Sequence, residues 1–232
     1  MKGFFITGTG TGVGKTIVTI IIGLYLKSHG YENMIALKPI ESGCKKINNV
    51  LTPHDGSLIK EILGLDVGLD VITPIRYSIP LAPMAASEIE GNPFDKSLLL
   101  RHIKEVANKY DHLLIEGIGG LMVPITDKYF VYNLIKDIKL PVIIVAGAGL
   151  GTINHTLMSV DFALNNGINV AGVIINNCSN DSSDESIASN PKIIRELSPA
   201  PVIGCIPYLE GLSHKDFENA VRCIDKSLLK YL

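Results

Sequence analysis

Residues 8–16 read Gly-Thr-Gly-Thr-Gly-Val-Gly-Lys-Thr and lie directly between the apolar runs 3–6 and 17–22. A buried strand, a glycine-rich turn, a Lys-Thr pair and a helix, in this order, make a loop that binds the phosphates of a nucleoside triphosphate. Its backbone N–H groups and the positive end of the helix attract phosphate. We expect Lys15 to reach the β- and γ-phosphates and the Thr16 hydroxyl to bind Mg²⁺. The stretch therefore predicts phosphoryl chemistry near the N-terminus.

The spacing within this loop departs from the common pattern by one residue. Four residues usually separate the first glycine from Gly-Lys-[Ser/Thr], whereas five, residues 9–13, follow Gly8 here. A glycine-rich turn without a ligand is the alternative, and the order of strand, loop and helix favours the phosphate loop. A dinucleotide-binding Gly-x-Gly-x-x-Gly pattern fits less well, because its last position would be Val13 or Lys15.

Length and composition exclude several classes of protein. The 232 residues suit one large α/β domain, and we expect a single domain over residues 1–232. The net charge of −2 argues against a nucleic-acid or membrane-surface partner. The apolar run 17–26 is too short to span a bilayer, and the N-terminus lacks a signal-peptide pattern. The four cysteines have no metal-ligand spacing, so we expect reduced thiols in a cytoplasmic protein.

Apolar runs alternate with helical patterns along the whole chain. Runs without polar alternation are typical of strands buried on both faces of a parallel sheet, and we expect them at 3–7, 34–38, 113–116, 142–146, 169–176 and 202–206. Helices are expected at 15–29, 57–63, 95–110, 131–138, 152–165, 191–197 and 215–231, and a mobile surface loop over the Ser- and Asp-rich run 178–186. The pattern predicts a single doubly wound, mostly parallel sheet with helices on both faces, of the P-loop NTPase type.

Polar residues follow several of these strands, where ligands bind in such folds. A lysine closing a buried strand, Lys38, is costly without an anionic partner. Glu116 stands where P-loop proteins place a carboxylate associated with Mg²⁺, and Asn176 can read a base edge. Taken singly, Lys38 also fits an exposed strand end, Glu116 a cap, Asn176 a turn residue and Asp55 a turn or helix N-cap.

In combination, these motifs resemble the dethiobiotin synthetase family. The resemblance is carried by residues 5–16, by Lys38-Pro-Ile-Glu-Ser-Gly43, by Glu116-Gly-Ile-Gly-Gly120, by Gly149-Leu-Gly-Thr-Ile-Asn-His155 and by Gly204-Cys-Ile-Pro207. They stand in the family's order over most of the chain, and the extra loop residue is also a feature of the family. The Lys-Pro-x-x-Ser-Gly and Gly-Leu-Gly-x-Ile-Asn-His segments are the most specific of these motifs.

The resemblance implies a homodimer that closes a cyclic urea with ATP as co-substrate and Mg²⁺ as cofactor. The substrates are 7,8-diaminononanoate (diaminopelargonate) and CO₂. An amine captures CO₂ as a carbamate, and a carbamate oxygen attacks the γ-phosphate to give a carbamic-phosphoric anhydride. The second amine then closes the ring and releases phosphate, in a step of biotin biosynthesis. Because two anions must meet, cations have to be concentrated at the site.

The resemblance also assigns roles to residues. Lys15 and Lys38 are the expected catalytic residues, the first on the phosphates and the second on the carbamate. The nucleotide-binding set is Gly12, Val13, Gly14, Lys15, Thr16, Ile17, Asn176, Pro207, Tyr208, Leu209 and Glu210. The substrate-binding set is Thr11, Lys38, Ser42, Gly151, Thr152 and Asn154, the last three from the other subunit. Thr16, Asp55 and Glu116 are the expected Mg²⁺ ligands.

One departure and one rival class remain. Many relatives carry an acidic residue where Gly10 stands, so this loop is less anionic. A partner-switching P-loop ATPase of the partitioning type would share the loop but carry a second lysine at the position of Gly10, and it would lack the 38–43 segment. Phosphate release that ignores the diamine would indicate that class.

Overall fold

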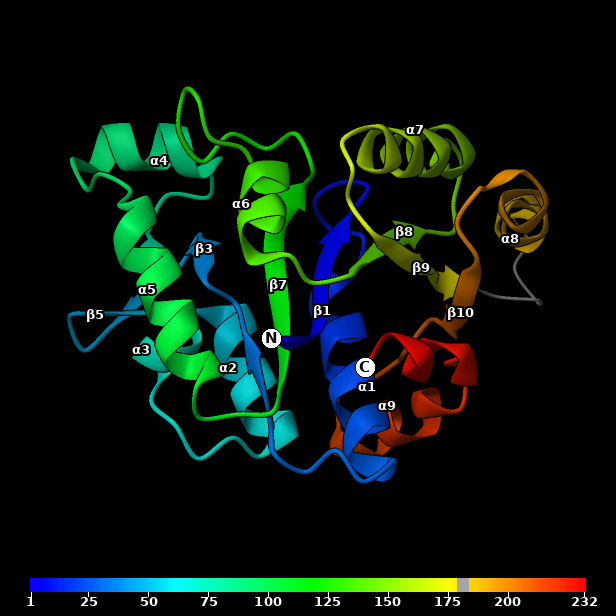
Figure 1. The fold of residues 1–232 in the computed structure, drawn as a ribbon, viewed down its shortest axis with the longest axis horizontal. Coiled ribbons are helices and arrows are strands. Elements are labelled where there is room, and N and C mark those ends of the chain that lie inside the picture. Colours follow the sequence, from blue (N-terminus) through cyan, green and yellow to red (C-terminus); the bar gives the residue numbers. More distant parts are fainter. Residues whose placement is uncertain (179–183) are drawn as a thin grey trace.

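A parallel six-stranded sheet organises the computed structural model, which describes residues 1–178 and 184–232 (Figure 1). The strand order is β10-β9-β8-β1-β7-β2, and each neighbouring pair is parallel. The strands are β1 (Lys2–Gly8), β2 (Met34–Leu37), β7 (His112–Gly120), β8 (Val142–Gly147), β9 (Val170–Cys178) and β10 (Val202–Pro207). Because all six run the same way, the loops that follow them share one edge of the sheet, as expected.

The apolar runs form strands because the sheet buries them on both faces. Phe4, Phe5 and Ile6 of β1 have no exposed surface, and neither do Ile143 and Ile144 of β8. These side chains belong to one continuous apolar core that also includes the helix faces packed on the sheet. Removing such side chains from water is the main contribution to folding free energy, which explains why continuous apolar runs predicted the sheet.

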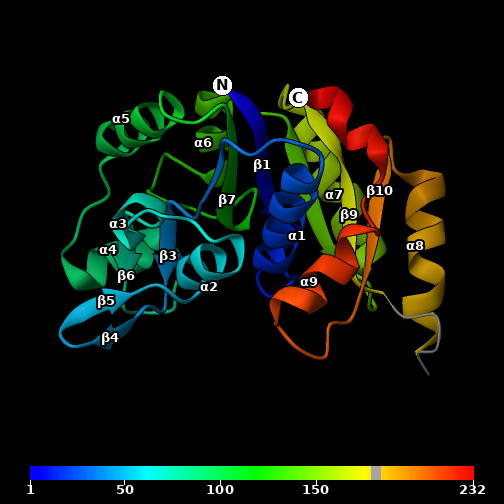
Figure 2. The same cartoon turned by 90° about the horizontal axis from the view of Figure 1, so that it is seen from below.

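Helices cover the sheet on two sides, and α1 and α9 lie opposite α5 and α6 across β1 and β7 (Figure 2). Parallel strands require such crossover connections, which are right-handed in nearly all proteins. The longer helices are α1 (Lys15–Ser28), α2 (His54–Leu63), α5 (Lys96–Ala107), α6 (Val131–Ile138), α7 (Thr152–Asn165), α8 (Glu185–Leu197) and α9 (His214–Val221). α4 (Pro83–Glu90) is as long as α6 and α9, and the shorter elements are α3 (Leu69–Ile72) and the 3₁₀-helix η1 (Lys226–Tyr231). The doubly wound architecture is thus confirmed.

Two small sheets lie beside the main one and were absent from the expectations. β3 (Ile40–Ser42) pairs in parallel with β6 (Ile75–Tyr77), and β4 (Lys45–Ile47) pairs with β5 (Val50–Thr52) in an antiparallel hairpin. Asn48 and Asn49 make its turn with positive φ angles of 49° and 63°. Strands of three residues carry no detectable periodicity, and β6 finds its partner far away in sequence. The β3 segment matters most here, because it directly follows Lys38.

Four expected helices have different limits: α2 begins at His54 and not at residue 57, α5 ends at Ala107 and not at residue 110, and two others differ further. The helix expected from Pro191 begins at Glu185, because Asp184 caps it by accepting from the Ser186 N–H, and the proline lies inside it. The helix expected over 215–231 is interrupted: α9 ends at Val221, Ile224 bridges to Gly204, and the Asp225 carboxylate starts η1 by accepting from the Ser227 N–H. Of the loop expected at 178–186, residues 179–183 lie outside the described residues. Tertiary contacts and capping side chains set these limits.

Gly3 offers a test of how β1 is fitted against β7. Its φ is +125°, and a Cβ at this position would lie 1.8 Å from the Leu113 carbonyl oxygen. We expect Gly3→Ala to lower the free energy of unfolding by about 4 kcal/mol, because the strands must separate or the backbone must distort. Gly30, with a φ of +87° and open space around it, is the matched control. Gly30→Ala should cost only about 1 kcal/mol. Equal losses in urea unfolding would contradict the prediction.

Candidate active site

The glycine-rich loop joins β1 to α1 at the carboxyl edge of the sheet. Its chain turns tightly at Gly14, which has a φ of +90° and directly precedes α1. A Cβ there would lie 2.0 Å from Nδ2 of Asn176 on β9, so the residue must be glycine for two reasons. The Thr9 N–H donates to the Val145 carbonyl at 2.9 Å, which ties the loop to β8. The start of α1 and the backbone of the loop thus lie at the edge of the sheet where a phosphate would bind.

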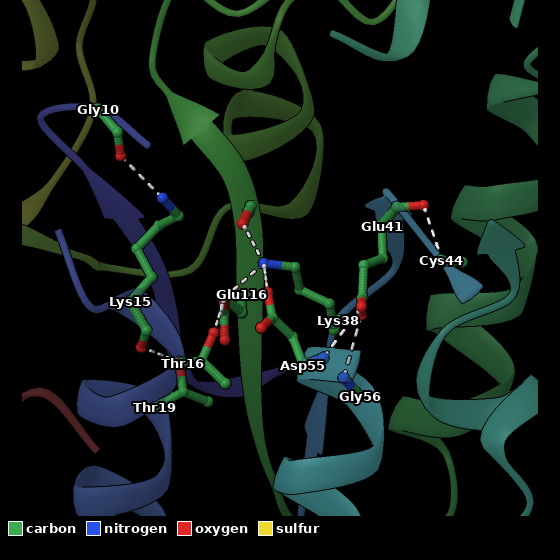
Figure 3. Close-up of polar contacts among 11 residues, drawn as sticks. Gly10, Lys15, Thr16, Thr19, Lys38, Glu41, Cys44, Asp55, Gly56 and Glu116 are labelled. Atoms are coloured by element: carbon green, nitrogen blue, oxygen red, sulfur yellow. Dashed lines mark hydrogen bonds and ion pairs between the residues drawn. The ribbon is translucent and has the colours of Figure 1, made fainter. Parts of the chain in front are cut away.

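Lys15 is buried and bends back over its own loop. Its Nζ donates to the Gly10 carbonyl at 2.9 Å (Figure 3). Burial and then the positive charge of Lys38 lower the pKa of Lys15 to about 8. Among the described residues, no carboxylate forms an ion pair with this ammonium, and an anion placed at the loop would stabilise its charged form.

Lys38 stands at the centre of the charged cluster. Its Nζ lies 2.5 Å from Oε1 of Glu116 and 3.1 Å from Oδ2 of Asp55, and it donates to the Gly117 carbonyl at 3.3 Å (Figure 3). Burial alone would lower the pKa of Lys38, but the Glu116 and Asp55 carboxylates outweigh it and hold the pKa above its ordinary value. The lysine therefore keeps its charge, and Glu116 and Asp55 are the anionic partners that a buried lysine requires.

Thr16 and Glu116 meet across the loop, and their oxygens suit a hard cation. The Thr16 hydroxyl donates to Oε1 of Glu116 at 2.9 Å, while the other oxygen, Oε2, is buried and has no hydrogen-bond partner among the described residues. Asp55 supplies a second, partly exposed carboxylate. The described residues contain no cluster of three or more His, Cys, Asp or Glu side chains arranged to hold a metal. Two carboxylates and a hydroxyl fit Mg²⁺, which usually completes its shell with water and substrate phosphates.

A cavity of about 650 Å³ opens over these groups. It brings together ten of the residues proposed from the sequence: Thr11, Gly12, Gly14, Lys15, Thr16, Ile17, Lys38, Ser42, Asp55 and Glu116. They come from the loop, the segment after β2, the first turn of α2 and the middle of β7. This convergence of distant segments follows from the parallel sheet.

A second cavity of about 430 Å³ adjoins the first and is mostly apolar. The two share Thr11 and Val123, and the second is also lined by Leu121, Met122, Met158 and Phe162. Near it, α7 starts at Thr152, which is buried, while Gly151 and Asn154 are exposed. These three residues do not line the first cavity of their own chain.

Asn176 and the segment after β10 take positions that the sequence did not specify. The Asn176 Nδ2 donates to the Val13 carbonyl at 3.2 Å, and its Oδ1 is buried without a hydrogen-bond partner among the described residues. The amide therefore supports the phosphate loop directly. Pro207 ends β10 in the position paired with Cys178, and Tyr208 is exposed. Neither Asn176 nor residues 207–210 line the first cavity.

Two strand limits near the site differ from those expected, and several cavity residues were overlooked. β2 ends at Leu37, so Lys38 follows the strand and does not close it. β7 continues to Gly120, so Glu116 lies within the strand, opposite Ile6 of β1, and does not end it. The overlooked residues that line the first cavity are Glu41, His54, Leu58, Pro80, Leu81, Ala82, Ile118, Gly119, Val123 and Leu212. Glu41 lies inside a quoted motif, which was the available signal. Pro80, Leu81 and Ala82 follow β6, a three-residue strand that is too short to show a periodicity in the sequence.

Comparison with known proteins identifies relatives over nearly the whole chain. A family model described as AAA domain matches residues 2–216. The ATP-dependent dethiobiotin synthetase BioD of Thermodesulfovibrio yellowstonii is 42% identical over 231 residues, covering 96% of each chain. The proteins of the same name from Aquifex aeolicus and Bacillus subtilis are 44% and 36% identical, over 88% and 96% of this chain and 86% and 94% of their own.

Similar solved structures share the fold. The MinC:MinD cell division protein complex of Aquifex aeolicus superimposes with a TM-score of 0.63 at 18% identity, covering 99% of this chain and 95% of the other. A putative plasmid partition protein from Borrelia burgdorferi gives a TM-score of 0.59 at 15% identity, covering 100% and 99%. The sequence relatives decide the family: this chain belongs to the ATP-dependent dethiobiotin synthetases.

Proposed function

We propose that this protein closes the cyclic urea of dethiobiotin from 7,8-diaminononanoate and CO₂, using ATP and Mg²⁺, in biotin biosynthesis. The observation that carries the proposal is the buried, charged Lys38 beside the phosphate loop. A carbamate that attacks a triphosphate needs a fixed cation between the two anions. The relatives are named ATP-dependent dethiobiotin synthetases, which supports ATP use and the product, and residues 1–232 would act as one domain.

The two lysines would stabilise different anions, Lys15 the phosphates and Lys38 the carbamate. Lys15 would leave the Gly10 carbonyl and contact the β- and γ-phosphates. Lys38 would hold the carbamate oxygen in line with the γ-phosphate, and the Thr11 and Ser42 hydroxyls, which line the same cavity, would fix the carbamate end. Phosphate would leave as the second amine attacks the carbonyl carbon.

Thr16, Asp55 and Glu116 would hold Mg²⁺. When bound, Mg²⁺ neutralises charge on the phosphate oxygens during transfer. Oε2 of Glu116 has no hydrogen-bond donor within the described part of the chain. This supports the assignment, since a buried carboxylate oxygen without a donor is costly unless a cation binds it. Asn176 and residues 207–210 would contact the adenine.

The second cavity suits the aliphatic chain of the substrate and a second copy of the protein. Met158 and Met122 line this cavity and expose 63% and 55% of their surface. Leu150, which directly precedes Gly151, exposes 91%. Exposed apolar side chains of this size favour an interface. In a homodimer, Gly151, Thr152 and Asn154 of one copy would bind the substrate carboxylate in the site of the other. We place the protein in the cytoplasm, where its four cysteines would stay reduced. Among residues 1–178 and 184–232, none of the helices has the length and apolar character of a membrane span.

The alternative, a partner-switching ATPase of the partitioning type, has only the fold in its favour. The residues that distinguish the two are Gly10, where that class has a lysine, and the Lys38-to-Gly43 segment, which lines the cavity with Lys38, Glu41 and Ser42.

The test is phosphate release by the purified protein with ATP, Mg²⁺ and bicarbonate, with and without 7,8-diaminononanoate. We expect release that depends on the diamine and a cyclic urea product by mass spectrometry. Equal release without the diamine, and no urea, would overturn the proposal in favour of the switching class.

Light scattering should give about twice the 25.1 kDa chain mass, and full activity of a monomer would overturn the cross-subunit assignment.

A further inference from the structure

Glu41 is a buried carboxylate to which the reaction above assigns no role. It lies on β3, three residues after Lys38, and exposes only 5% of its surface. Burial and the nearby Asp55 carboxylate raise the pKa of Glu41, so a charge here needs compensation. Its compensation comes from backbone N–H groups of another element.

Both carboxylate oxygens of Glu41 bind the start of α2. Oε1 accepts from the Asp55 N–H at 2.9 Å, and Oε2 accepts from the Gly56 N–H at 3.0 Å (Figure 3). The residue before α2 is Pro53, whose side chain has no hydrogen-bonding group. The first N–H groups of a helix need acceptors from outside it, and Glu41 supplies them from a neighbouring strand.

The residue that Glu41 holds is the one whose side chain faces the charged cluster. The Asp55 carboxylate points away from Glu41 and lies 3.1 Å from Nζ of Lys38 (Figure 3). Lys38 and Glu41 belong to one short segment of chain. Lys38 contacts the side chain of Asp55, and Glu41 binds the backbone N–H of the same residue. Two oxygens already engaged by N–H groups make Glu41 a poor direct ligand for a cation.

We propose that Glu41 is a positioning residue that fixes the first turn of α2, so that the Asp55 carboxylate faces Lys38 and the cation site. Groups that orient metal ligands in this way commonly change metal affinity or activity by about 10–100-fold when replaced. The inference rests on the proposed role of Asp55 as a Mg²⁺ ligand.

The test measures cation binding directly, with Mn²⁺ as the probe. Loss of the free-ion electron paramagnetic resonance signal is followed in the presence of ADP, without the diamine. We expect Glu41→Ala to weaken Mn²⁺ binding about 10–100-fold and to raise the Mg²⁺ concentration for half-maximal activity by a similar factor. Glu41→Gln keeps one acceptor oxygen and should show an intermediate loss, which serves if the alanine variant does not fold.

Asp95 provides the matched control. It caps α5 by accepting from the Leu98 N–H at 2.9 Å, and it does not line the first cavity. Asp95→Ala should lower the melting temperature by about 2–4 °C, as loss of a cap does, and change Mn²⁺ binding less than about twofold.

Two outcomes would overturn the inference. One is a Glu41 variant whose Mn²⁺ affinity changes no more than that of Asp95→Ala, which would leave only a structural cap. The other is an Asp55→Asn variant that binds Mn²⁺ normally, because there would then be no ligand to position. The Mn²⁺ assay omits the diamine, so it gives a result even if the proposed ring closure fails.

Discussion

Lys38→Met is expected to abolish diamine-dependent phosphate release, with a loss of at least about 1,000-fold. The size follows from removing a preorganised charge aimed at two reacting anions, since loss of even one neutral donor at such a position costs about 100- to 1,000-fold. Nucleotide binding should change far less, because Lys15 and the loop N–H groups remain. The measurement is kcat for phosphate release, together with ADP affinity by calorimetry.

The same variant should also show what Lys38 does without a ligand. Its ammonium neutralises Glu116, which has no exposed surface, so Lys38→Met should destabilise the protein in metal-free buffer by about 3 kcal/mol. Added Mg²⁺ should restore part of that stability more than it does for the wild type. Lys46→Met, the same change at an exposed position of β4, is the control and should alter neither property. Turnover within tenfold of the wild type would refute the carbamate role of Lys38.

Glu116→Gln is expected to reduce turnover at least about 100-fold and to lower the free energy of unfolding by about 3 kcal/mol. The amide keeps the shape of the side chain but leaves the Lys38 ammonium, whose side chain is 4% exposed, with Asp55 as its remaining carboxylate. Removing one partner of a buried pair is costly because the other charge is left uncompensated. Chemical unfolding and steady-state kinetics measure the two effects.

The double variant Lys38→Met/Glu116→Gln separates stability from chemistry. With both charges removed, most of the lost stability should return, while activity should stay absent. Glu90→Gln is the control: that carboxylate accepts from the Ser78 hydroxyl and the Ile79 N–H, and no lysine pairs with it among the described residues. Stability losses that simply add in the double variant would contradict the direct coupling of Lys38 and Glu116.

The central sheet was predictable because its strands are buried on both faces. Each of the six apolar runs became a strand of the sheet, with limits that moved by a few residues, since continuous Val, Ile and Leu report burial. The small sheets and the short helices α3 and α4 were not predictable. Their residues are stabilised by partners distant in sequence, as when β3 pairs with β6, and they carry little local preference.

The candidate site divides in the same way. Lys15 and Thr16 follow from the spacing of one loop, because a phosphate loop is a local structure whose glycines, lysine and hydroxyl are consecutive. Glu41 lies within the motif of residues 38–43. Its role depends on contact with the N–H groups of α2, and the spacing of residues in the sequence does not predict that contact. Asn176 was expected to hydrogen-bond the adenine, which stays a prediction, and the structure adds that its Nδ2 donates to the loop carbonyl of Val13.

By itself, the amino-acid sequence determined the fold class, the phosphate loop and the family resemblance, because each depends on residues adjacent in the chain or on the order of motifs. Only the tertiary structure decided that Lys38 is paired with both Glu116 and Asp55, and that Glu41 holds the turn bearing Asp55. These contacts join segments up to 78 residues apart. Their geometry depends on how parallel strands bring distant loops to one edge, and on the cost of burying a charge without a partner.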